Sequence, residues 1–341
     1  MTIGTDVDLA VRLLRAGRLV AFPTETVYGL GADASSPAAV TGIFAAKGRP
    51  RAHPLIVHLA AASMLDDWAD APGDAARTLA ARFWPGPLTL ICRRATRVID
   101  DVTGGAPTVG LRVPSHPVAH ALLAAFGGGV AAPSANRFGR ISPTTAAHVR
   151  EDLGERVAYI LDGGACDVGV ESTIVDVSDD ARPALLRPGG VTREAIEAAL
   201  GRPLALGSST PAPGTLPSHY APRARVITVA PDELALTVAV HATGGVRVAA
   251  LGPAELIENV QLPSPIERHV MPARAEEMAH ELYAALRALD GRGVDVIVAV
   301  MPSEEGVGAA VADRLRRAAG PRASAAGAAD DVDDVTDGET P

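Results

Sequence analysis

A loop rich in hydroxyl groups follows a strand-like run near the start of the sequence. The segment FPTETVYGLGADA, residues 22–34, carries Thr26 among other hydroxyl side chains, a carboxylate and two glycines. Glycines let a backbone approach a ligand closely. The same hydroxyl groups can instead satisfy the backbone of a tight turn. The loop therefore indicates either a polar ligand site or a self-contained turn.

Three cations follow the expected end of a helix in KGRPRAHPLIVH. Lys47, Arg49 and Arg51 alternate, and alternate residues of an extended segment point the same way. Lys47 is the single lysine among 31 basic residues, and its compact ammonium group makes point-charge contacts with phosphate. Chance retention or stabilisation of the helix end is the alternative. His53 and His58 fit either a loop and a core strand or ligand contacts.

A second polar loop, PSAN, ends the strand-like run GVAA. Ser134 and Asn136 project alternately from it, and Ser142-Pro143 then has the form of a helix N-cap followed by the first helical residue. Free N–H groups at a helix N-terminus form a natural phosphate site. We therefore expect a helix that begins here, with Ser142 capping it, contacting phosphate, or doing both.

Two arginines lie in strands that are otherwise apolar. Arg112 belongs to TVGLRV, Arg187 ends ALLR, and Ser172 begins the further strand STIVDV. A charge in an apolar strand is costly unless it is paired. Each arginine is therefore either in an ion pair or facing a ligand cleft, and because the sequence indicates no partner, we expect the cleft.

Strand-like and helical runs alternate along the segment that carries these residues. Thr5 is the expected N-cap of a helix that stops at Gly17, and Ser36 opens a helix that stops at Gly48. This pattern predicts an α/β domain with a large mixed sheet. Further strands are expected over 55–59, 88–91, 108–113, 129–132, 158–161, 172–177 and 184–187.

A stretch rich in proline, glycine and serine, residues 207–223, predicts a linker. Residues 1–206 form the expected first domain, and residues 224–321 alternate as a small open-sheet α/β domain. Residues 322–341 are rich in Ala, Gly and Asp, which predicts a disordered acidic tail.

The composition is that of a globular protein, with 48% hydrophobic and 21% charged residues. Two cysteines without a Cys/His cluster fit a reducing compartment. No signal peptide and no apolar run of the roughly 18 residues that span a bilayer are recognisable, so we expect a cytoplasmic protein without a membrane segment. Residues 1–206 hold 20 basic and 21 acidic side chains, a net charge of −1, which argues against strong direct nucleic-acid binding.

Together these motifs resemble the YrdC-domain family of threonylcarbamoyl-AMP synthases. The resemblance covers the first 206 residues, and the later PSHYAP and LYAALRALD segments resemble the family's longer members. The family implies a twisted mixed sheet with helices around a large cleft, plus a smaller Rossmann-like domain. The motifs are FPTETVYGLG, KGRP, HPLIVH, FWPGPLTL, VGLRVPSHP, APSAN, DGG, GVESTIVD and LLRPG.

The resemblance implies a nucleotidyltransferase. Bicarbonate or CO₂ would carboxylate L-threonine, and the carbamate would attack the α-phosphate of ATP to give threonylcarbamoyl-AMP and pyrophosphate. Mg²⁺ would be carried by the ATP phosphates, with no protein ligand assigned. The product would pass to a tRNA threonylcarbamoyl transferase.

The resemblance also implies roles for particular residues. Lys47 and Arg49 would be catalytic, and His53 stands where the family pattern KGRPxxNP has Asn. L-threonine would be held by Thr26, His58, Arg112, the backbone of Ala132, and Ser172. ATP would be held by Lys47, Arg49, His53, Thr108, Ser134, Asn136, Ser142, Arg187 and Tyr220, with Tyr220 folding over the cleft from the linker.

Two other functions fit part of the pattern. A carbamoyl-adenylating module of hydrogenase maturation shares this kind of domain, but it usually adds cysteine-rich zinc motifs and an acylphosphatase-like segment that this sequence lacks. A protein that binds double-stranded RNA would also use a basic cleft. A steep loss of RNA affinity with salt would support that second alternative.

Overall fold

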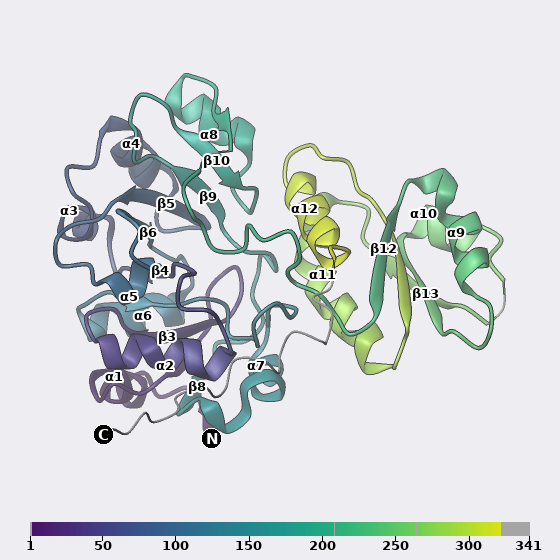
Figure 1. Cartoon of the computed structure of the whole chain (residues 1–341), viewed down its shortest axis with the longest axis horizontal. Coiled ribbons are helices and arrows are strands. Elements are labelled where there is room, and N and C mark those ends of the chain that lie inside the picture. The colour runs from purple at the N-terminus through teal and green to yellow at the C-terminus, as the bar shows by residue number, and fades with distance from the viewer. Residues whose placement is uncertain (1, 208, 264, 322–341) are drawn as a thin grey trace, which may run out of the picture.

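Two β-sheets organise the chain, and Figure 1 shows the larger on the left and the smaller on the right. The computed structural model describes residues 2–207, 209–263 and 265–321. The larger sheet is mixed and has eleven strands, whereas the four strands of the smaller sheet are all parallel. The predicted α/β class with a Rossmann-like second sheet is therefore confirmed. The predicted acidic tail, residues 322–341, lies outside the described residues.

The large sheet has the strand order β1-β8-β2-β3-β7-β4-β6-β5-β9-β10-β11. Its strands are β1 (Thr2–Gly4), β2 (Val20–Phe22), β3 (Gly29–Asp33), β4 (Ile56–His58), β5 (Leu88–Arg93), β6 (Thr108–Arg112), β7 (Val130–Ala131), β8 (Tyr159–Leu161), β9 (Thr173–Asp176), β10 (Ala184–Arg187) and β11 (Ala205–Leu206). The helices around it are α1 (Val7–Arg15), α2 (Pro37–Lys47), α3 (Leu65–Trp68), α4 (Asp74–Phe83), α5 (Asp100–Thr103), α6 (Pro117–Phe126), α7 (Ala146–Leu153) and α8 (Arg193–Leu200).

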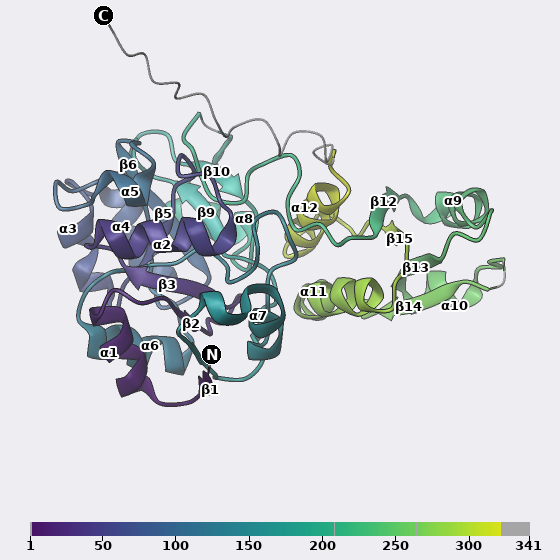
Figure 2. The same ribbon diagram turned by 60° about the horizontal axis from the view of Figure 1, so that its bottom comes forward.

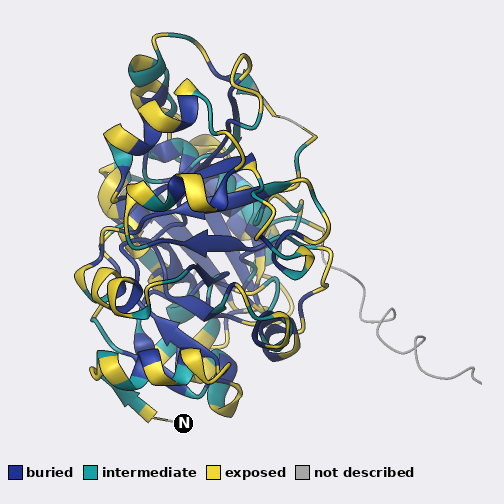
Figure 3. Ribbon diagram, turned by 90° about the vertical axis from the view of Figure 1, so that its left-hand side faces the viewer, coloured by how far each residue is buried: buried dark blue, intermediate teal, exposed yellow. Residues whose placement is uncertain are grey.

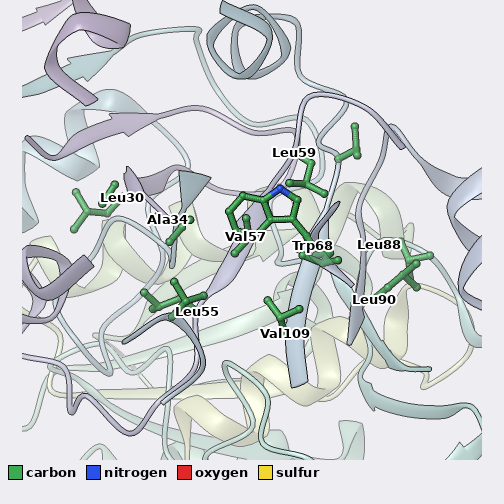
Figure 4. Packing of buried hydrophobic residues seen from close by; sticks show 14 of the residues in the cluster. Leu30, Ala34, Leu55, Val57, Leu59, Trp68, Leu88, Leu90 and Val109 are labelled. Carbon is green, nitrogen blue, oxygen red and sulfur yellow. The ribbon is translucent and has the colours of Figure 1, made fainter. Parts of the chain in front are cut away.

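Separate apolar clusters cover the two faces of the large sheet. Val20 and Phe22 pack with α1 and α6 on one face, while Ala21 between them belongs to the larger cluster on the other face. This alternation follows from the two-residue period of a strand. Figure 4 shows part of the larger cluster, with Trp68 near Val57. Figure 3 shows buried strands inside and exposed residues on the outer sides of the helices.

Local capping signals explain where the first two helices begin and end. α2 was expected between Ser36 and Gly48, and the structure confirms both: Ser36 Oγ accepts from the backbone N–H of Ala39, and Gly48 adopts a left-handed φ of 64°. For α1 the expected cap was wrong. Asp6, not Thr5, is the N-cap, because its carboxylate accepts from the N–H of Leu9 at 2.8 Å.

The smaller sheet has the order β12-β15-β13-β14. Figure 2 shows α11 and α12 on the face toward the large sheet and α9 and α10 on the far face. The sequence pattern did not predict α10 or β14. The elements are β12 (Arg225–Val229), α9 (Leu234–His241), β13 (Val248–Pro253), α10 (Ala254–Asn259), β14 (Glu267–Met271), α11 (Ala275–Gly291), β15 (Val296–Val300) and α12 (Gly308–Ala318).

The predicted linker runs between the two sheets and is held on both sides. On the side of the large sheet, Ala221 forms an isolated β-bridge with Arg140. On the other side, the N–H of His219 donates to the carbonyl of Arg317 in α12 at 3.1 Å. Among the described residues, no helix has the combination of length and apolar character that crossing a bilayer requires.

Candidate active site

Strand directions bring several predicted site residues to one edge of the large sheet. His58 ends β4 and Arg112 ends β6, and they are register partners in parallel strands. β9 runs opposite to β6, because it is parallel to β5 and β5 is antiparallel to β6. Ser172 therefore precedes β9 at this edge, and Arg187 ends the antiparallel β10 there. Four segments distant in sequence meet at this place.

A pocket of about 50 Å³ lies at this edge, bounded by the sheet and by linker residues Pro213, Gly214, His219 and Tyr220. One water molecule needs about 10–15 Å³, so the pocket has room for only a few waters. The predicted site residues that line it are Thr26, Arg49, His58, Arg112, Ala132, Ser134, Ser172, Arg187 and Tyr220. Those outside its lining are Lys47, His53, Thr108, Asn136 and Ser142.

Arg112 is both ion-paired and directed to the pocket. Its Nη2 lies 2.8 Å from Oε1 of Glu25, and the two side chains are 4% and 6% exposed. These two atoms are close but not aligned for a hydrogen bond, so Nη2 keeps an unused N–H. Nη1 donates to Thr26 Oγ1 at 2.9 Å. The sequence indicated no partner for Arg112, and Glu25 is that partner.

The hydroxyl-rich loop combines both of its predicted possibilities. Thr24 Oγ1 donates to the carbonyl of Val27 at 2.6 Å and accepts from the N–H groups of Thr26 and Val27, each at 3.2 Å. This is a turn that satisfies its own backbone. Thr26, held by that turn and by Arg112, still lines the pocket.

His58 is a neutral imidazole in the pocket wall. The side chain is 4% exposed, and its Nδ1 has no hydrogen-bond partner among the described residues. Burial, and then the nearby charge of Arg112, lower the pKa of His58 to about 3. At neutral pH the ring therefore offers one N–H donor and one nitrogen acceptor without charge.

Lys47 lies behind the pocket, where it holds the PSAN loop. Its Nζ donates to the carbonyls of Ser134 and Asn136, each at 2.5 Å. Burial, followed by the charge of Arg49, lowers the pKa of Lys47 well below its usual value. Asn136 supports the same loop, since its Nδ2 donates to the carbonyls of Arg137 and Arg140 at 2.9 and 2.7 Å.

Arg49 enters the pocket from the loop after α2. Its Nη2 donates to the carbonyl of Pro54 at 3.0 Å, and its guanidinium carbon lies 5.6 Å from the ring centroid of Phe138. His53 packs on the same ring, with centroids 5.4 Å apart. The expectation that Lys47, Arg49 and Arg51 point the same way is wrong, because the segment turns and leaves Arg51 exposed.

Arg187, like Arg49, is a cation of the pocket without an ion-pair partner within the described part of the chain. Its nitrogens donate to backbone carbonyls and to Ser172 Oγ. Nε and Nη2 reach the carbonyl of Ser172 at 3.1 and 2.9 Å, and Nη1 reaches that of Pro213 at 3.0 Å. Ser172 Oγ also lies 2.8 Å from Thr89 Oγ1.

Ser142 does not begin a helix. α7 starts at Ala146, and Thr145 caps it by accepting from the N–H of His148. Ser142 Oγ instead donates to Glu171 at 2.5 Å. The expectation was wrong because Thr145 is a second capping residue three positions later and takes the role.

Glu171 and His219 line the pocket, and sequence reasoning did not single them out. The signal was present, since Glu171 immediately precedes Ser172 in GVESTIVD and His219 precedes Tyr220 in PSHYAP. Thr108 lies at the start of β6, the opposite end of the strand from Arg112.

The linker residue Tyr220 closes the pocket in an unusual backbone conformation. It is 1% exposed and has a φ of 62°, which non-glycine residues adopt rarely. Its ring centroid is 4.1 Å from that of His219 and 5.8 Å from that of Tyr283 in α11. Its hydroxyl has no hydrogen-bond partner in the described structure.

The charges of the pocket suit an anionic ligand. Arg49, Arg112 and Arg187 line it, while Glu171, the one carboxylate among its described lining residues, pairs with Arg314 at 2.7 Å. Glu25, outside the lining, pairs with Arg112. Such fixed positive groups in a site with little water stabilise phosphate and carboxylate charges strongly.

Comparisons with known proteins agree over nearly the whole chain. A family model described as "Telomere recombination" matches residues 12–189, and one described as "Threonylcarbamoyl-AMP synthase, C-terminal domain" matches residues 191–320. The threonylcarbamoyl-AMP synthase of Bacillus subtilis (strain 168) is 44% identical over 322 residues, 92% of each chain. The enzyme of the same name from Pyrococcus abyssi is 42% identical over 329 residues, 93% of this chain and 94% of the relative.

A solved structure resembles this one over the same extent. The crystal structure of P. abyssi Sua5 complexed with L-threonine has a TM-score of 0.87 at 39% identity, covering 94% of this chain and 98% of that chain.

Proposed function

The chain belongs to the threonylcarbamoyl-AMP synthase family, and from this membership we propose that it makes threonylcarbamoyl-AMP from L-threonine, bicarbonate or CO₂, and ATP. The observation that carries the proposal is the buried edge of the large sheet where Arg49, Arg112 and Arg187 line one pocket. The relatives' names support this synthase and give no support to a hydrogenase-maturation module or an RNA-binding protein.

The reaction is a nucleotidyl transfer. The threonine amine attacks CO₂ to form an N–C bond and loses a proton, which gives a carbamate. A carbamate oxygen then attacks the α-phosphorus of ATP, and the bond from that phosphorus to the bridging oxygen breaks, so that pyrophosphate leaves with the electron pair. No covalent bond to the protein is required, so catalysis rests on positioning and charge neutralisation.

Threonine fits the side of the pocket near β4 and β6. The unused N–H of Arg112 Nη2 suits the threonine carboxylate, and the neutral imidazole of His58 suits the hydroxyl or the amine. Thr26, the backbone of Ala132, and Ser172 complete the proposed threonine site.

ATP fits the side near β10 and the linker. Arg49 and Arg187 would neutralise phosphate charge, with Ser134 and Tyr220 as further contacts in the lining. We extend the proposal to His53, Thr108, Asn136 and Ser142, and to Lys47, which acts on the site through the PSAN loop carbonyls. Because the pocket holds only a few waters, ATP requires the linker to move outward, and its return would shelter the carbamate from water.

Magnesium would enter as part of the substrate. Among the described residues, no three His, Cys, Asp or Glu side chains are grouped to hold a metal ion. Glu171 in the pocket lining and Glu25 next to Arg112 are both engaged by arginines. We therefore propose that the ATP phosphates hold Mg²⁺, as is usual for this ion.

The proposal also covers the compartment of the enzyme, the recipient of its product and the roles of its domains. Two buried free cysteines are compatible with a reducing cytoplasm. The product would pass to a tRNA threonylcarbamoyl transferase. We assign catalysis to residues 1–206, cover of the site to 207–223, and a docked second domain to 224–321.

Pyrophosphate release by the purified protein tests the function. The assay compares L-threonine, L-serine and no amino acid, with and without bicarbonate, in Mg²⁺ and ATP. We expect release only with both L-threonine and bicarbonate. Pyrophosphate release that does not depend on the amino acid, or no release at all, would contradict the proposal.

A variant pair tests the role of Arg187. Arg187→Gln should lower kcat/KM for ATP by at least about tenfold, or about 1.4 kcal/mol. Arg193→Gln, which removes an arginine whose side chain is 37% exposed and paired with Glu197, should match the unsubstituted enzyme. Equal effects of the two substitutions would count against an ATP site at Arg187.

A further inference from the structure

Helix α12 of the second domain carries one fully buried arginine that contacts a residue of the pocket wall. Arg314 is 0% exposed, and its Nε donates to Glu171 Oε2 at 2.7 Å. Its Nη2 donates to the carbonyl of Pro188 at 3.1 Å, and its Nη1 to Asp313 at 2.6 Å. The guanidinium carbon also lies 5.2 Å from the ring centroid of Tyr220.

Two of these contacts are made to the neighbours of proposed substrate-binding residues. Glu171 precedes Ser172, and Pro188 follows Arg187. Ser172 and Arg187 are in turn joined by hydrogen bonds from the guanidinium to the Ser172 carbonyl. Arg314 therefore bridges the two segments from the outside while Arg187 bridges them from the pocket side.

Glu171 is an unfavourable neighbour for a polyphosphate unless it is compensated. Burial alone would raise its pKa, but Arg314 and Arg187, together with hydrogen bonds from Ser142 and Arg314, outweigh burial and lower the pKa to about 2. The group is thus a carboxylate at neutral pH, in the lining of a pocket made for anions. Without Arg314, the remaining cation that lowers the pKa of Glu171 is Arg187.

We propose that Arg314 is a positioning residue for the ATP side of the pocket: by neutralising Glu171 it leaves the positive charge of Arg187 available to phosphate. The second domain thereby completes the electrostatics of a site whose other charges come from the first domain. Tyr283 of α11 assists, since its hydroxyl donates to Glu171 at 2.8 Å. The identification of the ligand as ATP rests on the proposed function. The contacts of Arg314 are observed independently of that proposal.

The test uses the full chain with Arg314→Gln, and Arg316→Gln as the matched control. Arg316 lies in the same helix but is half-exposed and paired with Glu304. ATP is highly charged and the threonine zwitterion has no net charge, so Arg314→Gln should raise KM for ATP at least about tenfold and KM for threonine less than about threefold. Arg316→Gln should leave both unchanged. Equal increases of both KM values with Arg314→Gln would overturn the proposal.

A second variant separates charge neutralisation from domain docking. Glu171→Gln combined with Arg314→Gln removes both charges, so KM for ATP should return to within about threefold of the unsubstituted value. If the double variant is as impaired as the single one, Arg314 only docks the domain and the proposal fails. Should Arg314→Gln not fold, Glu171→Gln alone decides, because the proposal expects no increase in KM for ATP and an increase above about fivefold would reject it.

Direct binding of a non-hydrolysable ATP analogue, measured by calorimetry, separates this inference from the proposed reaction. A protein that binds the analogue but releases no pyrophosphate would contradict the reaction, and the same variants would then test Arg314 through Kd. Normal release with unaltered analogue affinity in Arg314→Gln would overturn the inference alone. No analogue binding by the unsubstituted protein would overturn both.

Discussion

Arg112 and Glu25 form an ion pair in which both side chains are almost fully buried, 4% and 6% exposed. A buried charge without a partner costs several kcal/mol, so each of the two side chains depends on the other. Glu25 also accepts from the N–H of Ser115 at 3.2 Å, which fixes the carboxylate. The pair thus serves stability through Glu25, and under the proposed function the unused N–H of Arg112 would serve ligand binding.

Substitutions at this pair should separate the two roles. Arg112→Gln leaves a buried carboxylate unpaired and should destabilise the protein by about 3–5 kcal/mol, and also raise KM for threonine at least tenfold, roughly 1.4 kcal/mol. The double variant Glu25→Gln/Arg112→Gln should recover most of the stability, seen by urea unfolding, but not the threonine affinity. Recovery of both would mean that Arg112 has no direct role in binding.

For single residues, the sequence indicated which charges would be costly to bury, but not which side chains compensate them. An arginine in an apolar strand identified Arg112 and Arg187 as special, because burial of a charge is expensive wherever it occurs. Glu25 and Arg314, their neighbours in space, come from distant parts of the chain. Only strand register and the docking of the two domains bring them together.

The linker bounds the pocket on the side away from the sheet, and we propose that it controls access. Gly214 has a φ of 74°, and a Cβ built there would collide with the Tyr220 hydroxyl and lie 2.7 Å from Arg187 Nη1. Gly207, at the other end of the linker, has a similar φ of 71° but nothing within 4 Å. The two glycines therefore share the backbone requirement and differ in their surroundings.

This difference gives a matched pair of substitutions. Gly207→Ala should cost about 1 kcal/mol of stability because it needs a positive φ. Gly214→Ala should cost more, because its Cβ also collides with Tyr220. Only Gly214→Ala should also raise KM for ATP, at least about fivefold, since it displaces Tyr220 and Arg187. Pyrophosphate release at varied ATP concentrations measures this. Matching KM values for the two variants would argue against a linker that shapes the ATP site.

Elements with strong local signals were predictable, and weakly marked elements were not. The cap and the stop of α2 are both in the sequence, at Ser36 and Gly48. β14 lies at the edge of its sheet and alternates exposed and half-buried residues, so its sequence ERHVM lacks an apolar run. α10 has only six residues, too few for a helical period to stand out.

The two domains share one apolar cluster and should behave as one cooperative unit. Ile141 and Val170 of the first domain pack in the same cluster as residues of α11 and α12. Arg287 of α11 also pairs with Asp152 through two hydrogen bonds of 2.6 and 3.2 Å. None of this was predictable from local patterns, because contacts between domains depend on the finished surfaces of both.

Calorimetry of the whole chain tests this cooperativity. We expect a single thermal transition for the unsubstituted protein and two transitions for Val170→Ala/Arg287→Gln, which weakens the shared surface. Val298→Ala, in a cluster confined to the second domain, should cost about 2 kcal/mol and keep one transition. Two transitions in the unsubstituted protein would show that the domains unfold independently.

The separation of Glu171 from Arg314 along the chain has a consequence for synthesis on the ribosome. The two residues are 143 positions apart. Translation adds about 5–20 residues per second, and domains fold as they emerge, so roughly 7–30 seconds separate the synthesis of Glu171 from that of the arginine that compensates it. Until α12 has emerged, the growing chain has most of the proposed pocket but not its final charge.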